Sequence, residues 1–191
     1  MRDMGSDTQA EPKAQIRARL RAARDAADDR ARVAAAVRLW ARLRHLCGAT
    51  LAGYLPLAGE VDPRGAMRAL SHDNNLCVPV VAAQGTALRF REWWPGCPTA
   101  PGAFGVEEPV TGGWRIPDVL IVPVLGFDAT GVRLGYGGGF YDRTLAGLPG
   151  ARTIGVALEA QRVDRLPRDA TDVPLMEIVT EAGLYRPDPP E

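Results

Sequence analysis

The chain has 191 residues, of which 46% are apolar and 24% are charged, and its formal net charge is zero. This length and balance predict one globular domain and exclude a wholly disordered chain. No apolar run approaches the roughly 20 residues of a membrane helix, and the N-terminal segment has no apolar core. We therefore expect no membrane binding and no secretory signal. The expected location is the cytoplasm.

The apolar spacing predicts two N-terminal helices, one over 13–27 and a second capped by Asp28 and Asp29. A strand over 51–57, a short helix over 62–70 and strands over 76–82 and 87–92 follow, and then a long ordered loop over 95–117. The last predicted elements are a strand over 118–124, a helix through about 145, and strands over 153–158 and 176–180. This alternation predicts an α/β three-layer sandwich, a mixed, mostly parallel sheet with helices on both faces. We expect a single domain over 1–191, with mobile tails at 1–11 and 186–191.

The basic residues are concentrated near the N-terminus. Residues 13–44 hold ten basic and three acidic residues, so the remainder of the chain is acidic. Such an arm is typical of a solvated arginine-rich face, or of a site for nucleic acid or a nucleotide. Zero net charge and the lack of a nucleic-acid-binding motif disfavour nucleic acid. Lys13 is the single lysine beside 22 arginines, so either an ammonium is required there or the lysine is a chance survivor.

The segment 121–143 carries the strongest chemical signal. A buried strand is followed by Arg133, four glycines within residues 135–139, and Asp142. Ligands of open α/β sheets bind beyond the carboxyl ends of strands, where glycine N–H groups and an arginine can hold phosphate and a carboxylate can hold a metal ion. The alternative is a flexible loop or a tight joint between strand and helix. The Rossmann and P-loop motifs both fail, because the third glycine and the motif lysine are missing.

The run GFDATGVRLGYGGGFYDR over residues 126–143 resembles the signature of the 5-formyltetrahydrofolate cyclo-ligase (methenyltetrahydrofolate synthetase) family. Further similar segments follow in the family's order: KAQIR at 13–17, GEVD at 59–62, FGVEEP at 104–109, IGVA at 154–157 and DVPL at 172–175. The resemblance implies an ATP-dependent ligase that uses Mg²⁺ to close 5-formyltetrahydrofolate to 5,10-methenyltetrahydrofolate, with release of ADP and phosphate. It further implies a monomer that binds ATP and a reduced folate, and no nucleic acid.

The same resemblance implies roles for individual residues. The expected ATP-binding residues are Lys13, Arg17, Arg133, Leu134, Gly135, Tyr136, Gly137, Gly138, Gly139, Phe140 and Tyr141, of which Arg133 and Tyr141 are expected to be catalytic. The expected substrate-binding residues are Leu55, Glu60, Phe104, Tyr136 and Phe140, and the expected metal ligands are Asp142 and Asp172.

Several alternatives stay open at this level. Glu60 can be a turn residue and Asp142 a helix cap, and Trp93 and Trp94 can face the substrate or lie buried. Three residues depart from the family pattern: Gly138 replaces a lysine of some members, Phe140 replaces a common tyrosine, and Thr171 stands where a histidine is expected. The competing functions are a paralogue that acts on another formyl or amide substrate, and a folate-binding protein without turnover.

Overall fold

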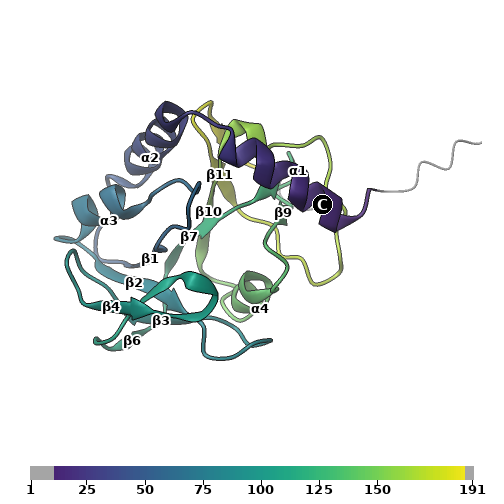
Figure 1. The fold of residues 1–191 in the computed structure, drawn as a ribbon. Helices are drawn as coiled ribbons and strands as arrows, with labels where there is room; N and C mark the ends of the chain where they lie inside the picture. The colour runs from purple at the N-terminus through teal and green to yellow at the C-terminus, as the bar shows by residue number, and fades with distance from the viewer. Residues whose placement is uncertain (1–10, 188–191) are drawn as a thin grey trace, which may run out of the picture.

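An eight-stranded sheet forms the centre of the structure, a computed structural model that describes residues 11–187 (Figure 1). Its strands lie in the order β12 (Leu184–Tyr185), β11 (Glu177–Val179), β10 (Arg152–Val156), β7 (Val119–Pro123), β1 (Thr50–Ala52), β2 (Asn75–Val80), β3 (Arg89–Glu92) and β6 (Trp114–Arg115). The strands from β11 to β2 are parallel to their neighbours, whereas β12, β3 and β6 are antiparallel. The expected mixed, mostly parallel sheet is therefore confirmed.

Both faces of the sheet are covered, because successive buried residues of each strand point to opposite sides. Leu51 belongs to the apolar cluster beneath α2 (Asp29–Leu43) and α3 (Arg64–Leu70), whereas Ala52 belongs to the cluster beneath α4 (Phe140–Ala146). Figure 1 shows α2 and α3 on one side of the sheet and α4 on the other. The three-layer architecture predicted from the sequence is correct.

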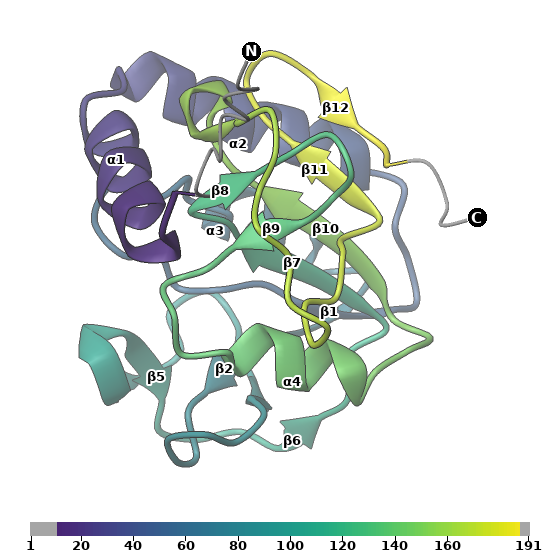
Figure 2. The ribbon, with the colours of Figure 1, turned by 90° about the vertical axis from the view of Figure 1, so that its right-hand side faces the viewer.

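The first helix, α1 (Lys13–Asp25), packs beside the sheet rather than on its faces (Figure 2). Ile16 and Leu20 bury one side of α1 against a cluster that includes Leu125, Val132 and Leu134. This cluster flanks two short antiparallel strands, β8 (Gly126–Phe127) and β9 (Arg133–Leu134). The expected break after α1 is present, and the Asp28 carboxylate accepts a hydrogen bond from the Arg30 N–H, capping α2.

The structure differs from the prediction in several places, among them the short strands β8, β9 and β12, which the sequence did not predict. The strand expected over 51–57 ends at Ala52, because the chain then leaves the sheet and the Tyr54 hydroxyl donates to the Val61 carbonyl oxygen at 2.6 Å. The loop expected over 95–117 contains β4 (Thr99–Pro101), the 3-10 turn η1 (Ala103–Gly105), β5 (Glu107–Pro109) and β6. These strands are two or three residues long, so they are too short to show a period, and pairing with distant strands specifies them.

A second 3-10 turn, η2 (Glu159–Gln161), follows β10. In the part of the chain that the structure describes, no helix has both the length and the apolar composition needed to cross a bilayer. Of the predicted mobile tails, residues 1–10 and 188–191 lie outside the described residues.

Candidate functional site

A cavity of about 550 Å³ lies at the carboxyl ends of the central strands. Its wall includes Tyr54 just after β1, Val81 just after β2, and Pro123 at the end of β7. The chain runs from β1 to β2 on one side and later enters β7 on the other side of β1, so the strand order reverses between β1 and β7. Ligands of open α/β sheets bind at this reversal, and the cavity has the size of a small-molecule site.

Every site residue expected from the sequence lines this one cavity. The lining set includes Lys13, Arg17, Leu55, Glu60, Phe104, Arg133, Leu134, Gly135, Tyr136, Gly137, Gly138, Gly139, Phe140, Tyr141, Asp142 and Asp172. Sequence analysis did not select Tyr54, Val81, Glu108 or Asp169, which also line it. For Asp169 a signal existed in the acidic spacing of RDATD at 168–172, and for Glu108 in the segment FGVEEP at 104–109, whereas Tyr54 and Val81 resemble ordinary core or loop residues.

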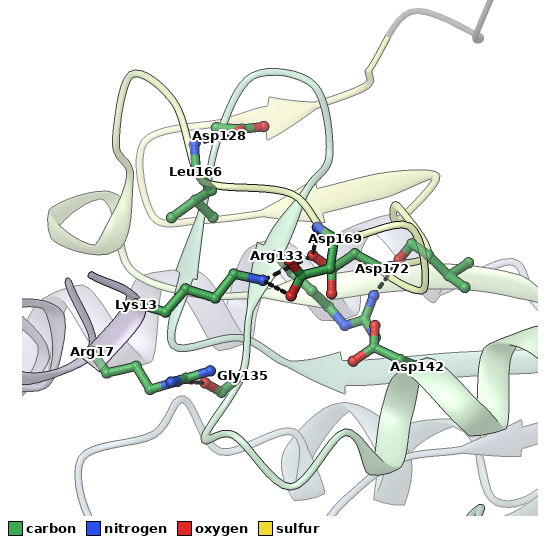
Figure 3. A network of polar contacts seen from close by, with 10 residues as sticks. Lys13, Arg17, Asp128, Arg133, Gly135, Asp142, Leu166, Asp169 and Asp172 are labelled. Carbon is green, nitrogen blue, oxygen red and sulfur yellow. Dashed lines mark hydrogen bonds and ion pairs between the residues drawn. The ribbon is translucent and has the colours of Figure 1, made fainter. Parts of the chain in front are cut away.

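Helix α1 delivers two cations to one end of the cavity. Lys13 and Arg17 are four residues apart and so share a face of the helix. The Lys13 Nζ atom lies 2.7 Å from Asp169 Oδ2 and 3.1 Å from Asp172 Oδ2, and the Arg17 Nε–H donates to the Gly135 carbonyl oxygen at 2.9 Å (Figure 3). Partial burial opposes the charge of Lys13, but the two carboxylates outweigh it and raise the pKa of the ammonium. Lys13 therefore stays charged at neutral pH.

The glycine segment lies against these cations. Gly137 and Gly139 adopt φ angles of 102° and 64°, the left-handed region that side chains disfavour. Gly139 is the residue before α4, and the Arg143 guanidinium of that helix donates to the Gly138 carbonyl oxygen at 2.6 Å. Because α4 has only seven residues, its dipole is modest, and most of the positive field at this end comes from side chains.

Arg133 and Asp142 form a largely buried ion pair beside the glycines. Arg133 Nη2 lies 2.6 Å from Asp142 Oδ1, and the side chains are 5% and 27% exposed. Arg133 also donates to the Val173 carbonyl oxygen, which joins β9 to the loop that carries Asp172. Burial lowers the pKa of Arg133, and Asp142 opposes that effect. Asp142 lies within the first turn of α4, and no side chain caps that helix at Gly139, so the cap interpretation of Asp142 is not supported.

The acidic residues fit a divalent cation only in combination with a ligand. Within residues 11–187, no three His, Cys, Asp or Glu side chains gather closely enough to form a metal site by themselves. Asp142 and Asp172 nevertheless line the same cavity, and Arg133 lies close to both (Figure 3). Mg²⁺ is commonly held by one or two carboxylates together with substrate phosphates, so this donor set is of the right kind.

The loop that carries Asp169 and Asp172 is anchored near its start by Asp128. The buried Asp128 accepts a hydrogen bond from the Leu166 N–H at 2.9 Å through Oδ2 and binds Thr130 through Oδ1 (Figure 3). The Asp169 N–H in turn donates to Asp172 Oδ2 at 2.7 Å. These bonds place both carboxylates opposite the start of α1.

The other end of the cavity is aromatic and carries the Glu60 carboxylate. The Tyr136 hydroxyl donates to Glu60 Oε1 at 2.6 Å, and the Leu57 N–H donates to Glu60 Oε2 at 2.9 Å. Glu60 thus stabilises its turn and faces the cavity as well. Phe104, at a φ of 58° and 67% exposed, meets Phe140 edge-to-face with a centroid separation of 5.6 Å. A flat ring system can pack against such an aromatic wall.

Two open questions are resolved by position. Trp93 is 8% exposed within the core and Trp94 is 42% exposed, and neither lines the cavity. The departures at 138 and 140 are linked in space, because a Cβ at Gly138 would stand 2.6 Å from the Phe140 ring. The Phe140 ring therefore occupies room that a side chain at 138 would need.

The basic arm is partly neutralised within the chain. The ion pairs Arg19–Glu11, Arg24–Asp25, Arg32–Asp29 and Arg42–Glu177 join arginines of α1 and α2 to nearby carboxylates. Lys13 and Arg17 instead point toward the cavity (Figure 3). The arm thus combines a solvated face with two cations that serve the site.

An α/β fold of this kind, with a cationic glycine segment and an aromatic, acid-bearing wall in one cavity, defines a class of proteins that bind a phosphate compound beside a second, flatter ligand. Comparison with known proteins narrows the class. The model of the 5-formyltetrahydrofolate cyclo-ligase family matches residues 9–181, and the chain belongs to this family.

Individual relatives agree with that assignment. The chain is 34% identical to the 5-formyltetrahydrofolate cyclo-ligase of Haemophilus influenzae over 138 residues, 68% of this chain and 74% of the relative. It is 31% identical to the enzyme of the same name from Mycolicibacterium smegmatis over 160 residues, 77% of this chain and 81% of the relative. The chain is therefore an enzyme of the cyclo-ligase class.

Solved structures show the same fold. The NMR structure of the Aquifex aeolicus 5,10-methenyltetrahydrofolate synthetase matches with a TM-score of 0.76 and 30% identity, over 94% of each chain. A 5,10-methenyltetrahydrofolate synthetase from Mycoplasma pneumoniae matches with a TM-score of 0.73 over 90% of this chain and 99% of its own. At 24% identity, the second comparison speaks for the fold alone.

Proposed function

We propose that this enzyme drives the conversion of 5-formyltetrahydrofolate to 5,10-methenyltetrahydrofolate with ATP. One observation carries the proposal: a single cavity holds the cationic glycine segment at one end and the Glu60 and aromatic wall at the other. A phosphate donor and a pterin can therefore meet within it. Such proximity supplies much of the rate in a two-substrate reaction.

The formyl oxygen of the folate is a poor leaving group, so it must be activated before the C–O bond can break. The formyl oxygen attacks the γ-phosphorus of ATP, a P–O bond forms, and ADP leaves. N10 of the folate then attacks the activated carbon, a C–N bond forms, the C–O bond breaks, and phosphate departs with the formyl oxygen. The N10 proton is lost, which leaves the methenyl cation. No protein nucleophile is needed, so positioning and charge neutralisation dominate.

At the phosphate end, we assign charge neutralisation to the cations that line the cavity. Lys13 and Arg17 line this end and would contact the ATP phosphates, and the backbone from Gly135 to Gly139 would cradle them. Arg133 faces the transferring phosphoryl group as a buried cation that keeps its charge. Burial raises the pKa of the Tyr141 hydroxyl, so Tyr141 remains a neutral donor near the reacting oxygen.

Asp142 and Asp172 would hold Mg²⁺ at this end. When bound, the ion neutralises charge on the phosphates and orients them. Lys13 pairs with Asp172 and Arg133 pairs with Asp142, so each proposed ligand stands beside a cation that lines the same cavity.

At the folate end, Glu60 is the expected pterin acceptor. A carboxylate has about four acceptor positions, and two are filled by the Tyr136 hydroxyl and the Leu57 N–H. The remaining positions can accept the ring N–H and amino hydrogens of a pterin. Leu55, Phe104 and Phe140 supply the apolar wall. Both ends of the cavity come from one chain, which supports a monomer as the working unit; size-exclusion chromatography tests this.

The decisive experiment follows the absorbance of methenyltetrahydrofolate with purified protein, 5-formyltetrahydrofolate and MgATP. Product that forms only with ATP, with one ADP per turnover, supports the proposal. Product without ATP would contradict ATP dependence. Binding of the folate without turnover would favour a folate-binding protein, and turnover only of another formyl or amide compound would favour a paralogue.

A further inference from the structure

Arg24, near the end of α1, is a buried cation that the site described above does not use. Its side chain is 8% exposed. Its Nη1 atom donates to the Tyr136 hydroxyl oxygen at 2.7 Å, and its Nε atom donates to Asp25 Oδ1 at 2.9 Å. The guanidinium thus connects α1 to the glycine segment more than a hundred positions further along the chain.

Arg24, Tyr136 and Glu60 form a chain of two hydrogen bonds, in which each donor and acceptor can be assigned. A guanidinium only donates, so the phenol oxygen of Tyr136 must accept from Arg24. The single hydroxyl proton of Tyr136 is then directed to Glu60 Oε1, 2.6 Å away. A rotated hydroxyl would break both bonds. Arg24 therefore fixes the direction in which the Tyr136 hydroxyl donates, toward Glu60.

We propose that Arg24 is a positioning residue for the folate site, which acts through Tyr136 to hold Glu60 in place as an ionised acceptor. This inference rests on the proposed role of Glu60 in folate binding. Arg24 does not line the cavity and touches neither substrate in this arrangement. Arg24 therefore acts on Glu60 through the hydrogen bond to Tyr136 and through the positive charge of its guanidinium.

The charge matters because Glu60 is surrounded by few cations. Arg24, itself paired with Asp25, faces it from α1, Tyr54 from the segment after β1, and Tyr136 and Tyr141 from the glycine segment and α4. Arg32 of α2 donates to the carbonyl oxygen of the preceding residue, Gly59, at 3.2 Å. Burial raises the pKa of Glu60, and Arg24 opposes that effect. Burial also raises the pKa values of the three tyrosines, so they stay neutral. Arg24 is thus the nearby cation that favours the ionised carboxylate.

The position of Arg24 also joins the two ends of the cavity. Lys13, Arg17 and Arg24 are spaced by four and seven residues, which places all three on one stripe of α1. The helix that presents cations to the phosphate end therefore also holds the acceptor of the folate end.

The test compares Arg24→Gln and Arg24→Lys with the wild type. For Arg24→Gln we expect the KM for 5-formyltetrahydrofolate to rise about tenfold, the value of one lost charge-assisted bond, while the KM for ATP stays within about twofold. The acid limb of the pH profile of kcat/KM for the folate should move to higher pH, because Glu60 loses the cation that favours ionisation. Arg24→Lys keeps the charge and should return the limb toward the wild-type position.

Controls separate this role from simple packing. Arg21→Gln changes an exposed arginine of the same helix and should leave both KM values and the pH limb unchanged. Tyr136→Phe breaks the connection but keeps Arg24, and should also raise the folate KM. If Arg24→Gln raises both KM values equally, or leaves the acid limb where it is, Arg24 is structural and the proposal is wrong. A wild type that makes no methenyltetrahydrofolate would overturn the proposed function, and this inference with it.

Discussion

Asp142 and Arg133 form an ion pair with an N–O distance of 2.6 Å in which the arginine is almost wholly removed from water. The two residues are nine positions apart, on either side of the glycine segment. The acid of the proposed metal site thus also neutralises a buried cation. Asp142 is consequently tied to the stability of the fold as well as to ligand binding.

Asp142→Asn should lower both stability and turnover. The pair with Arg133 makes the charge of Asp142 a stabilising one. An amide leaves the buried guanidinium without its counter-ion, which costs about 2 kcal/mol after allowance for partial exposure. Turnover should fall by orders of magnitude, and the stabilisation by MgATP should shrink. Thermal melts with and without MgATP measure both effects.

Asp164→Asn is the matched control, because Asp164 is exposed and does not line the cavity. It should behave like the wild type. An Asp142→Asn protein with wild-type turnover and a normal response to MgATP would remove Asp142 from the metal site and leave Asp172 as the candidate.

Lys13→Ala should weaken ATP binding and leave the fold intact. The Lys13 side chain is 23% exposed and pairs with Asp169, 68% exposed, and with Asp172, 16% exposed, so these partly exposed pairs contribute about 1 kcal/mol to folding. The KM for ATP should rise at least about tenfold, the value of one charged contact to phosphate. Lys13→Arg should lose activity as well, since a planar fork does not replace a compact ammonium. Normal steady-state kinetics in both variants would mean that the single lysine has no special role.

Glu60→Gln should raise the KM for 5-formyltetrahydrofolate more than the KM for ATP. The bond to the pterin changes from charged to neutral, a loss of about 1–2 kcal/mol, or roughly tenfold. Because burial raises the pKa of Glu60, the wild type should lose kcat/KM for the folate as pH falls, when the carboxylate takes up a proton. The glutamine variant should lack this acid limb. An equal rise in both KM values would place Glu60 in the turn rather than in the folate site.

Glu177→Gln should destabilise the fold without changing the site. The buried Glu177 on β11 accepts from Arg42 of α2 at 2.6 Å and from Arg152 of β10 at 3.0 Å. Burial opposes its charge, but the two arginines prevail and lower the pKa of the carboxyl. Its contribution is therefore present above the unfolded pKa of about 4.3 and is lost as pH falls through the folded value.

We expect Glu177→Gln to lower the free energy of unfolding by about 2 kcal/mol at neutral pH. This difference from the wild type should become smaller as the pH falls. Urea denaturation at several pH values measures it, with Glu107→Gln as the control at an exposed glutamate. A difference between wild type and Glu177→Gln that stays constant down to acid pH would show that the charge contributes nothing. Kinetic constants should not change, because Glu177 does not line the cavity.

Local patterns in the sequence determined the types of the main elements. The buried run of β7 and the stripe of Ile16 and Leu20 on α1 are visible as apolar spacing, because a period of two or 3.6 residues is a local property. The glycine segment before α4 was visible for the same reason. Two- and three-residue strands such as β4 and β6 could not be predicted, because pairing across the chain creates them.

The site was determined in part by the same local information. The spacing of Lys13 and Arg17 already placed both on one face of a helix, and the glycine segment already predicted a ligand site. The tertiary structure alone decided what each charge meets: Lys13 pairs with Asp169, 156 positions away, and Arg24 holds Tyr136, 112 positions away. No periodicity relates such residues, since only the reversal of strand order at β1 and β7 and the packing of α1 beside them bring these segments together.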